Sequence, residues 1–225
     1  LKVIEKALND APDQQISLTD PDARSMKTRG TGIVGYNVQT AVDAKHHLIV
    51  AHEVTNDGID RSQLSSMATQ VRTAIGSETL TVIADRGYFK GEEILSCHEA
   101  GIIAIVPKTH TSAAKAEGRF DKADFIYNAS INEYRCPANQ RLIWRFARVE
   151  GGLLMNRYWS SACPTCSIKL QCTPSDYRRV SRWEHQTVLD EMERRLDLAP
   201  DSMRIRRQTV EHPLGTIKSW MGSAH

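Results

Sequence analysis

Residues 80–89 have the sequence Leu80-Thr-Val-Ile-Ala-Asp85-Arg-Gly-Tyr-Phe89. The almost wholly apolar run before Asp85 is typical of a strand that is buried on both faces of a sheet. Asp85 follows at the carboxyl end of that strand, where open α/β sheets usually bind their ligands. The simpler alternative is that Asp85 only begins a turn ahead of Gly87, since aspartate is favoured in turns.

The segments on either side of this strand predict a mixed α/β sheet flanked by helices. Alternating residues predict two strands that form a hairpin, and a helical stripe and a second buried strand follow. The predicted elements are strands 36–42 and 47–54, helix 60–75, strand 80–84, helix 91–100 and strand 102–106.

Changes in composition divide the chain into four parts. We expect a helical tail and polar linker in residues 1–32 and the first part of the core in 33–108. Residues 109–182 alternate short strand-like runs with turns, which predicts a β-rich insertion that contains cysteines. Residues 183–225 are charged and helical, with a break at Pro200, and are expected to complete the core.

The composition is that of a globular protein, with 225 residues, 40% hydrophobic and 25% charged. A formal net charge of +2 does not argue for nucleic-acid binding, so any basic footprint must be local. No apolar run approaches the roughly 20 residues that span a bilayer, and no secretory signal is visible. Together with an odd number of cysteines, this predicts reduced thiols, a cytoplasmic location and no membrane partner.

Glu211 is a second candidate catalytic acid, because it is surrounded by cations. The basic residues of this cluster are Arg204, Arg206, Arg207, His212 and Lys218. A carboxylate within a basic patch fits a site where the acid binds a divalent cation and the cations hold a DNA backbone. Asp85 and Glu211 would then be ligands of Mg²⁺ in a two-metal phosphodiester-cutting site. The alternative is that Glu211 is a solvated residue of a charged helix.

Three motifs, in order along the chain, resemble bacterial insertion-sequence transposases of the DDE class. They are Gly35-Tyr-Asn-Val-Gln-Thr-Ala-Val-Asp43, Ala84-Asp-Arg-Gly-Tyr-Phe89 and Val210-Glu-His-Pro-Leu-Gly-Thr-Ile-Lys218. Asp20-Pro-Asp-Ala-Arg24 and the cysteine-bearing stretch are similar to the same family. The resemblance covers nearly the whole chain.

This resemblance implies an RNase H-like mixed sheet, interrupted by the β-rich cysteine-containing insertion. It also implies cutting and rejoining of double-stranded DNA at terminal inverted repeats and target sites, with Mg²⁺ or Mn²⁺, by a homodimer. By position, Asp85 is the second acid of the triad and Glu211 the third. DNA contacts are expected from Tyr88, Arg204, Arg206, Arg207 and Lys218.

The first acid of the triad has no clear counterpart. In the resembled family it lies upstream of Gly35 in an Asp-Gly-Ser/Thr context, which does not occur between Leu1 and Gly35. Asp43, at the predicted hairpin tip, is the first candidate to replace it, ahead of Asp20. We therefore expect a fragment, truncated at both ends, that lacks the first catalytic acid and the last helix.

Four of the five cysteines have the spacing of a metal-binding knuckle. Cys163 and Cys166 form C-x-x-C, Cys172 follows, and Cys136 lies upstream in the β-rich stretch. Four thiolates can hold a structural Zn²⁺. Unliganded thiols are the alternative, and a redox C-x-x-C is disfavoured without a thioredoxin-like βαβ context. Cys97 is expected to be a core thiol.

Two other functions stay open at this point. One is a catalytically inactive DNA- or zinc-binding remnant of a transposase, which the missing first acid favours. The other is an unrelated metal-dependent nuclease of the same fold that uses Asp43.

Overall fold

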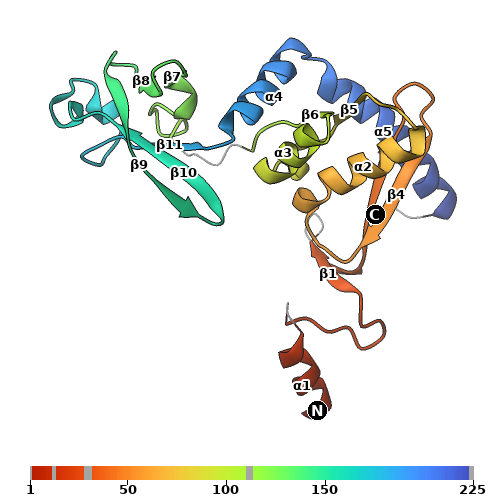
Figure 1. Cartoon of the computed structure of the whole chain (residues 1–225). Coiled ribbons are helices and arrows are strands. Elements are labelled where there is room, and N and C mark those ends of the chain that lie inside the picture. Colours follow the sequence, from red (N-terminus) through yellow and green to blue (C-terminus); the bar gives the residue numbers. More distant parts are fainter. Residues whose placement is uncertain (1, 12–13, 28–31, 110–113, 223–225) are drawn as a thin grey trace. The chain divides into compact units, whose positions relative to one another are not determined.

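The computed structural model describes residues 2–11, 14–27, 32–109 and 114–222. The chain divides into two compact units (Figure 1). Unit 1 comprises Leu1–Thr109 and Val188–His225, and unit 2 comprises His110–Thr187. The insertion expected in residues 109–182 begins one residue before unit 2 and ends five residues before the end of that unit.

Unit 1 contains three two-stranded sheets and most of the helices. Its elements are α1 (Lys2–Asp10), β1 (Arg24–Lys27), β2 (Gly32–Gly35), β3 (Asn37–Val42), β4 (Ile49–Thr55), the 3-10 helix η1 (Asp60–Ser62), α2 (Leu64–Ile75), β5 (Leu80–Ile83), the 3-10 helix η2 (Arg86–Tyr88), α3 (Gly91–Glu99), β6 (Ile102–Ile105) and α5 (Ser202–Met221). α4 (Gln186–Leu198) begins at the end of unit 2 and continues into unit 1.

The predicted hairpin and the two predicted apolar strands are confirmed, but the expected burial on both faces is wrong, because Thr81 of β5 and Ile103 of β6 are exposed. β3 and β4 pair antiparallel, and β5 and β6 pair parallel with α3 between them in the chain. The structure differs from a single mixed sheet, because the β3–β4 pair and the β5–β6 pair are separate sheets among the described residues. Residues of both β3 and β5 line a cavity of about 270 Å³. The two strands are not paired with each other by backbone hydrogen bonds among the described residues.

Helices cover the strands of unit 1 with their apolar faces. α2 buries Leu64, Met67, Ala68 and Val71, and it ends at Gly76, whose φ of 68° is the left-handed conformation that glycine adopts without strain. α5 packs on β3 and β5 (Figure 1). Met192 of α4 is almost fully buried, and its sulfur accepts a hydrogen bond from the backbone N–H of Val106 at 3.4 Å.

Unit 2 is a five-stranded antiparallel sheet in the order β11-β10-β9-β8-β7. Its elements are the 3-10 helix η3 (Lys122–Asp124), β7 (Ile126–Asn128), β8 (Glu133–Arg135), β9 (Arg141–Glu150), β10 (Leu153–Trp159), the 3-10 helices η4 (Cys163–Thr165) and η5 (Lys169–Gln171), and β11 (Val180–Trp183). One face of the sheet carries a small core made of Phe125, Tyr134, Leu142, Tyr158 and Val180. The rings of Tyr134 and Tyr158 meet edge to face with centroids 5.2 Å apart, an arrangement that aromatic pairs favour.

Candidate active site

Asp85 lies directly after β5, at the carboxyl end of the parallel β5–β6 pair. It caps η2, and its Oδ1 accepts a hydrogen bond from the backbone N–H of Gly87 at 2.8 Å. The side chain is 45% exposed. Asp85 therefore begins a turn and also presents a carboxylate at the strand end, and its role as a metal ligand stays a prediction.

Arg206 of α5 forms an ion pair with Asp85. Its Nη2 lies 2.8 Å from Oδ2 of Asp85, and the arginine side chain is 27% exposed. The two partners are 121 positions apart in the sequence. This contact fixes α5 at the carboxyl end of β5, and it offsets the negative charge of Asp85.

A second carboxylate, from Asp60, lies beside Asp85. A β-carbon placed on Gly87 would be 3.0 Å from Oδ1 of Asp85 and 3.4 Å from Oδ2 of Asp60. Oδ1 of Asp60 accepts hydrogen bonds from the side-chain amides of Asn37 at 2.8 Å and Gln39 at 2.7 Å. Sequence reasoning missed Asp60, which it placed only inside a predicted helix. The usable signal was its position just before the apolar face of α2, the usual place of a capping acid.

Tyr88 completes this hydrogen-bonded group. Its hydroxyl donates to Oε1 of Gln39, the almost fully buried residue whose amide nitrogen donates to Asp60. Burial, followed by the negative charges of Asp60 and Asp85, raises the pKa of Tyr88 to about 12. The phenol is therefore a neutral donor at physiological pH. This inward contact is a role other than the expected DNA contact.

The raised pKa of Tyr88 predicts a pH-dependent stability. The folded protein holds the phenol proton more tightly than the unfolded chain, whose tyrosine titrates near 10. The contribution is therefore complete below pH 10 and is lost as the pH rises towards 12. We expect the difference in free energy of unfolding between the wild type and Tyr88→Phe to shrink over this interval. A difference that stays constant across it, measured by urea unfolding, would contradict the assignment.

Glu211 lies on a different side of α5 from Arg206. Five residues separate the two positions, which corresponds to about 140° around a helix. The Glu211 side chain is 70% exposed, and its Oε1 lies 4.0 Å from Nε of Arg207. Spacings of three, four and seven residues place Arg204, Arg207, Glu211 and Lys218 along one exposed face of the helix. Glu211 thus belongs to a basic stripe, as expected, while Arg206 reaches Asp85.

The two candidates for the first acid both accept hydrogen bonds from other parts of the chain than Asp85. Oδ2 of Asp43 accepts from the backbone N–H of His46 at 2.7 Å and lies 2.7 Å from its Nδ1. The backbone hydrogen bond is the main reason why the pKa of Asp43 is lowered. Asp20 accepts a hydrogen bond from the hydroxyl of Tyr36 at 2.8 Å. Neither contact involves Asp85.

The structure therefore brings together Asp85, Asp60, Tyr88 and Arg206, but it places Glu211 on the exposed stripe. Among the residues that the structure describes, no group of three or more His, Cys, Asp or Glu side chains is arranged to hold a metal ion. In the same part of the chain, no helix is long and apolar enough to cross a membrane.

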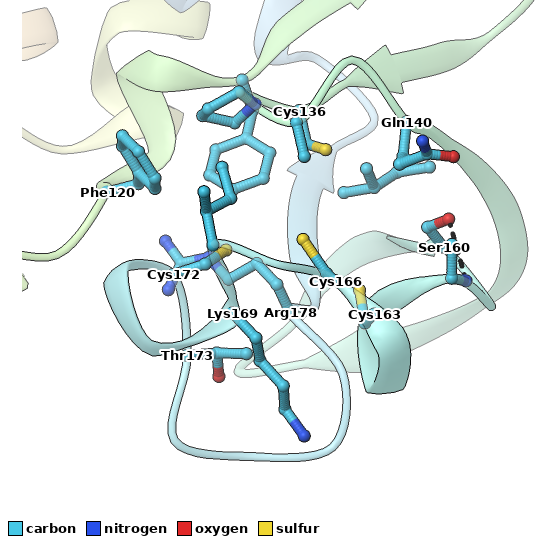
Figure 2. A pocket seen from close by; sticks show the side chains of 16 residues that line it. Phe120, Cys136, Gln140, Ser160, Cys163, Cys166, Lys169, Cys172, Thr173 and Arg178 are labelled. Carbon is cyan, nitrogen blue, oxygen red and sulfur yellow. Dashed lines mark hydrogen bonds between the residues drawn. The ribbon is translucent and has the colours of Figure 1, made fainter.

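The cysteines divide between the two units. Cys97 of α3 is 1% exposed, and burial raises the pKa of its thiol to about 11, so the expected core thiol is confirmed. Cys136, Cys163, Cys166 and Cys172 are free thiols in unit 2, and all four line one cavity (Figure 2).

Unit 1 thus combines a carboxylate at the end of a parallel strand with a basic helix packed beside it. The chain belongs to the transposase DDE domain family, whose model matches residues 8–225. No curated protein and no solved structure matches the chain.

Proposed function

We propose that this chain is the catalytic domain of a DNA transposase that cuts and rejoins DNA at the ends of an insertion sequence. Membership of the transposase DDE domain family supports the proposal. The observation that carries it is the contact between Arg206 and Asp85, because this contact attaches the helix that bears Glu211 to the strand end that bears the second acid. In this proposal unit 1 is RNase H-like and the active form is a homodimer.

The residues around Asp85 fit a divalent metal. Asp60 and Asp85 offer carboxylate oxygens, the ligands that Mg²⁺ and Mn²⁺ prefer. When bound, the metal would supply an activated attacking oxygen and stabilise the leaving oxygen. Arg206 now provides the positive charge beside Asp85, and a metal ion would take over that function. In this proposal Glu211, on the exposed face of the same helix, is the third acid.

The protein's own residues would bind and orient the DNA. Arg204, Arg207 and Lys218 are exposed along one face of α5 and would contact backbone phosphates, which position a duplex without reading its sequence. Gln39, held by Asp60 and Tyr88, would keep the Asp60 carboxylate in one orientation. Metal ligands usually need such hydrogen-bonded support.

Nicking of supercoiled plasmid DNA in Mn²⁺ or Mg²⁺ tests the proposal and separates its alternatives. We expect metal-dependent nicking that Asp60→Asn lowers about 10³-fold or more, because the substitution removes one of the two carboxylates that hold the metal in this proposal. Asp43→Asn is the matched control and should leave the nicking rate unchanged. Loss of nicking in Asp43→Asn would instead support a nuclease that uses Asp43. DNA binding without any nicking by the wild type would support an inactive remnant.

A further inference from the structure

Four cysteines of unit 2 meet at one place although they come from three separate segments. Cys136 lies in the turn between β8 and β9, Cys163 and Cys166 frame η4, and Cys172 follows η5. Figure 2 shows their side chains around one cavity, with those of Cys163 and Cys166 close together at the η4 turn. Cys97 lies in unit 1 and takes no part. Convergence of four thiols from three segments is not expected of cysteines that serve only as small apolar residues.

Each thiol is carried by a tight, hydrogen-bonded turn. The backbone N–H of Cys136 donates to the carbonyl of Gln140 at 3.0 Å, and that of Asn139 donates to the carbonyl of Cys136 at 2.8 Å. The N–H of Cys166 donates to the carbonyl of Cys163 at 3.3 Å, and the N–H of Cys172 donates to that of Lys169 at 2.9 Å. These turns hold the cysteine backbones in place and leave side-chain rotation as the remaining freedom.

The cavity has the size and composition that suit a single metal ion. Its volume is about 30 Å³, which is room for about one water-sized species. Among the described residues that line it, none carries a carboxylate or an imidazole. Its ligands are thus all sulfur, and tetrahedral sulfur sites in proteins hold zinc or iron.

Arg178 supplies a second, independent observation. Its side chain lines the same cavity, and its guanidinium lies 5.3 Å from the ring centroid of Phe125. Its Nε is buried and has no hydrogen-bond partner within the part of the chain that the structure describes. A buried donor without an acceptor is costly. A zinc ion with four thiolates carries a net negative charge, so a coordinated sulfur would give this donor an anionic acceptor.

We propose that Cys136, Cys163, Cys166 and Cys172 bind one structural Zn²⁺ ion in unit 2. In the described ranges, no three of these side chains already stand at metal-binding positions, so the site is completed by rotation of the thiols within their turns. The ion fastens the β8–β9 turn to the loop that precedes β11. Cys136 and Cys172 also pack against the aromatic core of the unit, and the ion therefore extends that small core. This site is separate from the proposed DNA chemistry.

Two alternatives to a zinc ion are a disulfide, which accounts for fewer of these observations, and an iron ion. A disulfide between Cys163 and Cys166 would leave Cys136, Cys172 and the buried Nε of Arg178 without a role. An iron ion has the same sulfur ligands available, and the metal analysis below distinguishes it from zinc.

The test is the metal content of the full chain, purified under reducing conditions without chelators. We expect about one zinc per chain by elemental analysis, and Co²⁺ substitution should give the intense visible absorption of a tetrahedral thiolate site. Cys163→Ser and Cys166→Ser should each lower the zinc content at least tenfold, while Cys97→Ala, the matched control, should retain it. A strong chelator should lower the midpoint temperature of thermal unfolding of unit 2 in the wild type, followed by the fluorescence of its tryptophans.

Three results would overturn the proposal. They are a folded wild-type chain that neither contains zinc nor takes up added zinc, full zinc content in both serine variants, and iron in place of zinc. If a serine variant fails to fold, Co²⁺ titration of the wild type in competition with a chelator tests the proposal instead. A site of four thiolates must bind Co²⁺ with the expected visible absorption, and the absence of that absorption would overturn the proposal.

Discussion

Asp85→Asn is expected to abolish metal-dependent DNA cleavage while DNA binding stays within about twofold of the wild type. A metal ion contributes several kcal/mol to the stabilisation of a phosphoryl-transfer transition state, which corresponds to a loss of about 10³-fold or more. The isosteric amide keeps an acceptor for the backbone N–H of Gly87, so the η2 turn should persist. The measurement is the single-turnover nicking rate at saturating protein, with binding followed separately by anisotropy.

The substitution also breaks the ion pair with Arg206, and a control must separate the two effects. Arg206→Gln removes the same ion pair but leaves the Asp85 carboxylate in place. We expect this variant to retain most of the nicking rate at saturating protein. An equal loss in both variants would show that the attachment of α5, rather than metal binding by Asp85, is what cleavage requires. Full cleavage by Asp85→Asn would refute the proposed catalytic role.

Leu142→Ala is expected to destabilise unit 2 by about 2–5 kcal/mol, the usual cost of a leucine-to-alanine change in a closed core. Leu142 is 1% exposed and packs among Phe125, Tyr134 and Tyr158 on one face of the sheet. A unit with so few core residues has little capacity to fill the resulting cavity. Urea unfolding followed by tryptophan fluorescence is a suitable measurement, because three of the four tryptophans (Trp144, Trp159 and Trp183) belong to unit 2.

Ile143→Ala is the matched control, one residue along the same strand. Successive side chains of a strand point to opposite faces, and Ile143 is 37% exposed. Its loss should cost less than about 1 kcal/mol, as expected for positions near the surface. Similar destabilisation by both substitutions, at the same zinc concentration, would mean that the core of unit 2 is not confined to one face.

The sequence predicted best those elements whose pattern is local. The β3–β4 hairpin and β5 follow from residue alternation and apolar runs, and both are confirmed within a few residues. α4 and α5 are separated at Pro200, as expected from the missing N–H of proline. β11 was missed, because Val180–Trp183 is too short to show alternation. β1 was also missed, because the polar residues of Arg24–Lys27 form a strand only by pairing with β2.

The candidate site was predictable only in part, because its contacts are not local. Asp85 could be found from the strand that precedes it. Which residue of α5 lies at Asp85, Arg206 or Glu211, depends on how the helix is rotated when it packs, and no local pattern indicates that rotation. Asp60 was hidden for a related reason. Its neighbours Asn37 and Gln39 come from another strand, and only the folded chain places them together.

The discontinuity of unit 1 has a consequence for synthesis on the ribosome. Helix α5 is synthesised only after all of unit 2. Until then β3 and β5 lack the helix that packs on them. The entropic cost of bringing α5 back to β3 and β5 grows with the length of the flexible chain between them. If unit 2 folds first, that flexible chain is shorter, because the residues of unit 2 are already ordered. Lys108, before unit 2 in the chain, and Glu193, after it, form an ion pair within unit 1. Their Nζ and Oε1 atoms lie 2.7 Å apart. Until α5 docks, the nascent chain exposes an apolar surface that chaperones recognise and that promotes aggregation.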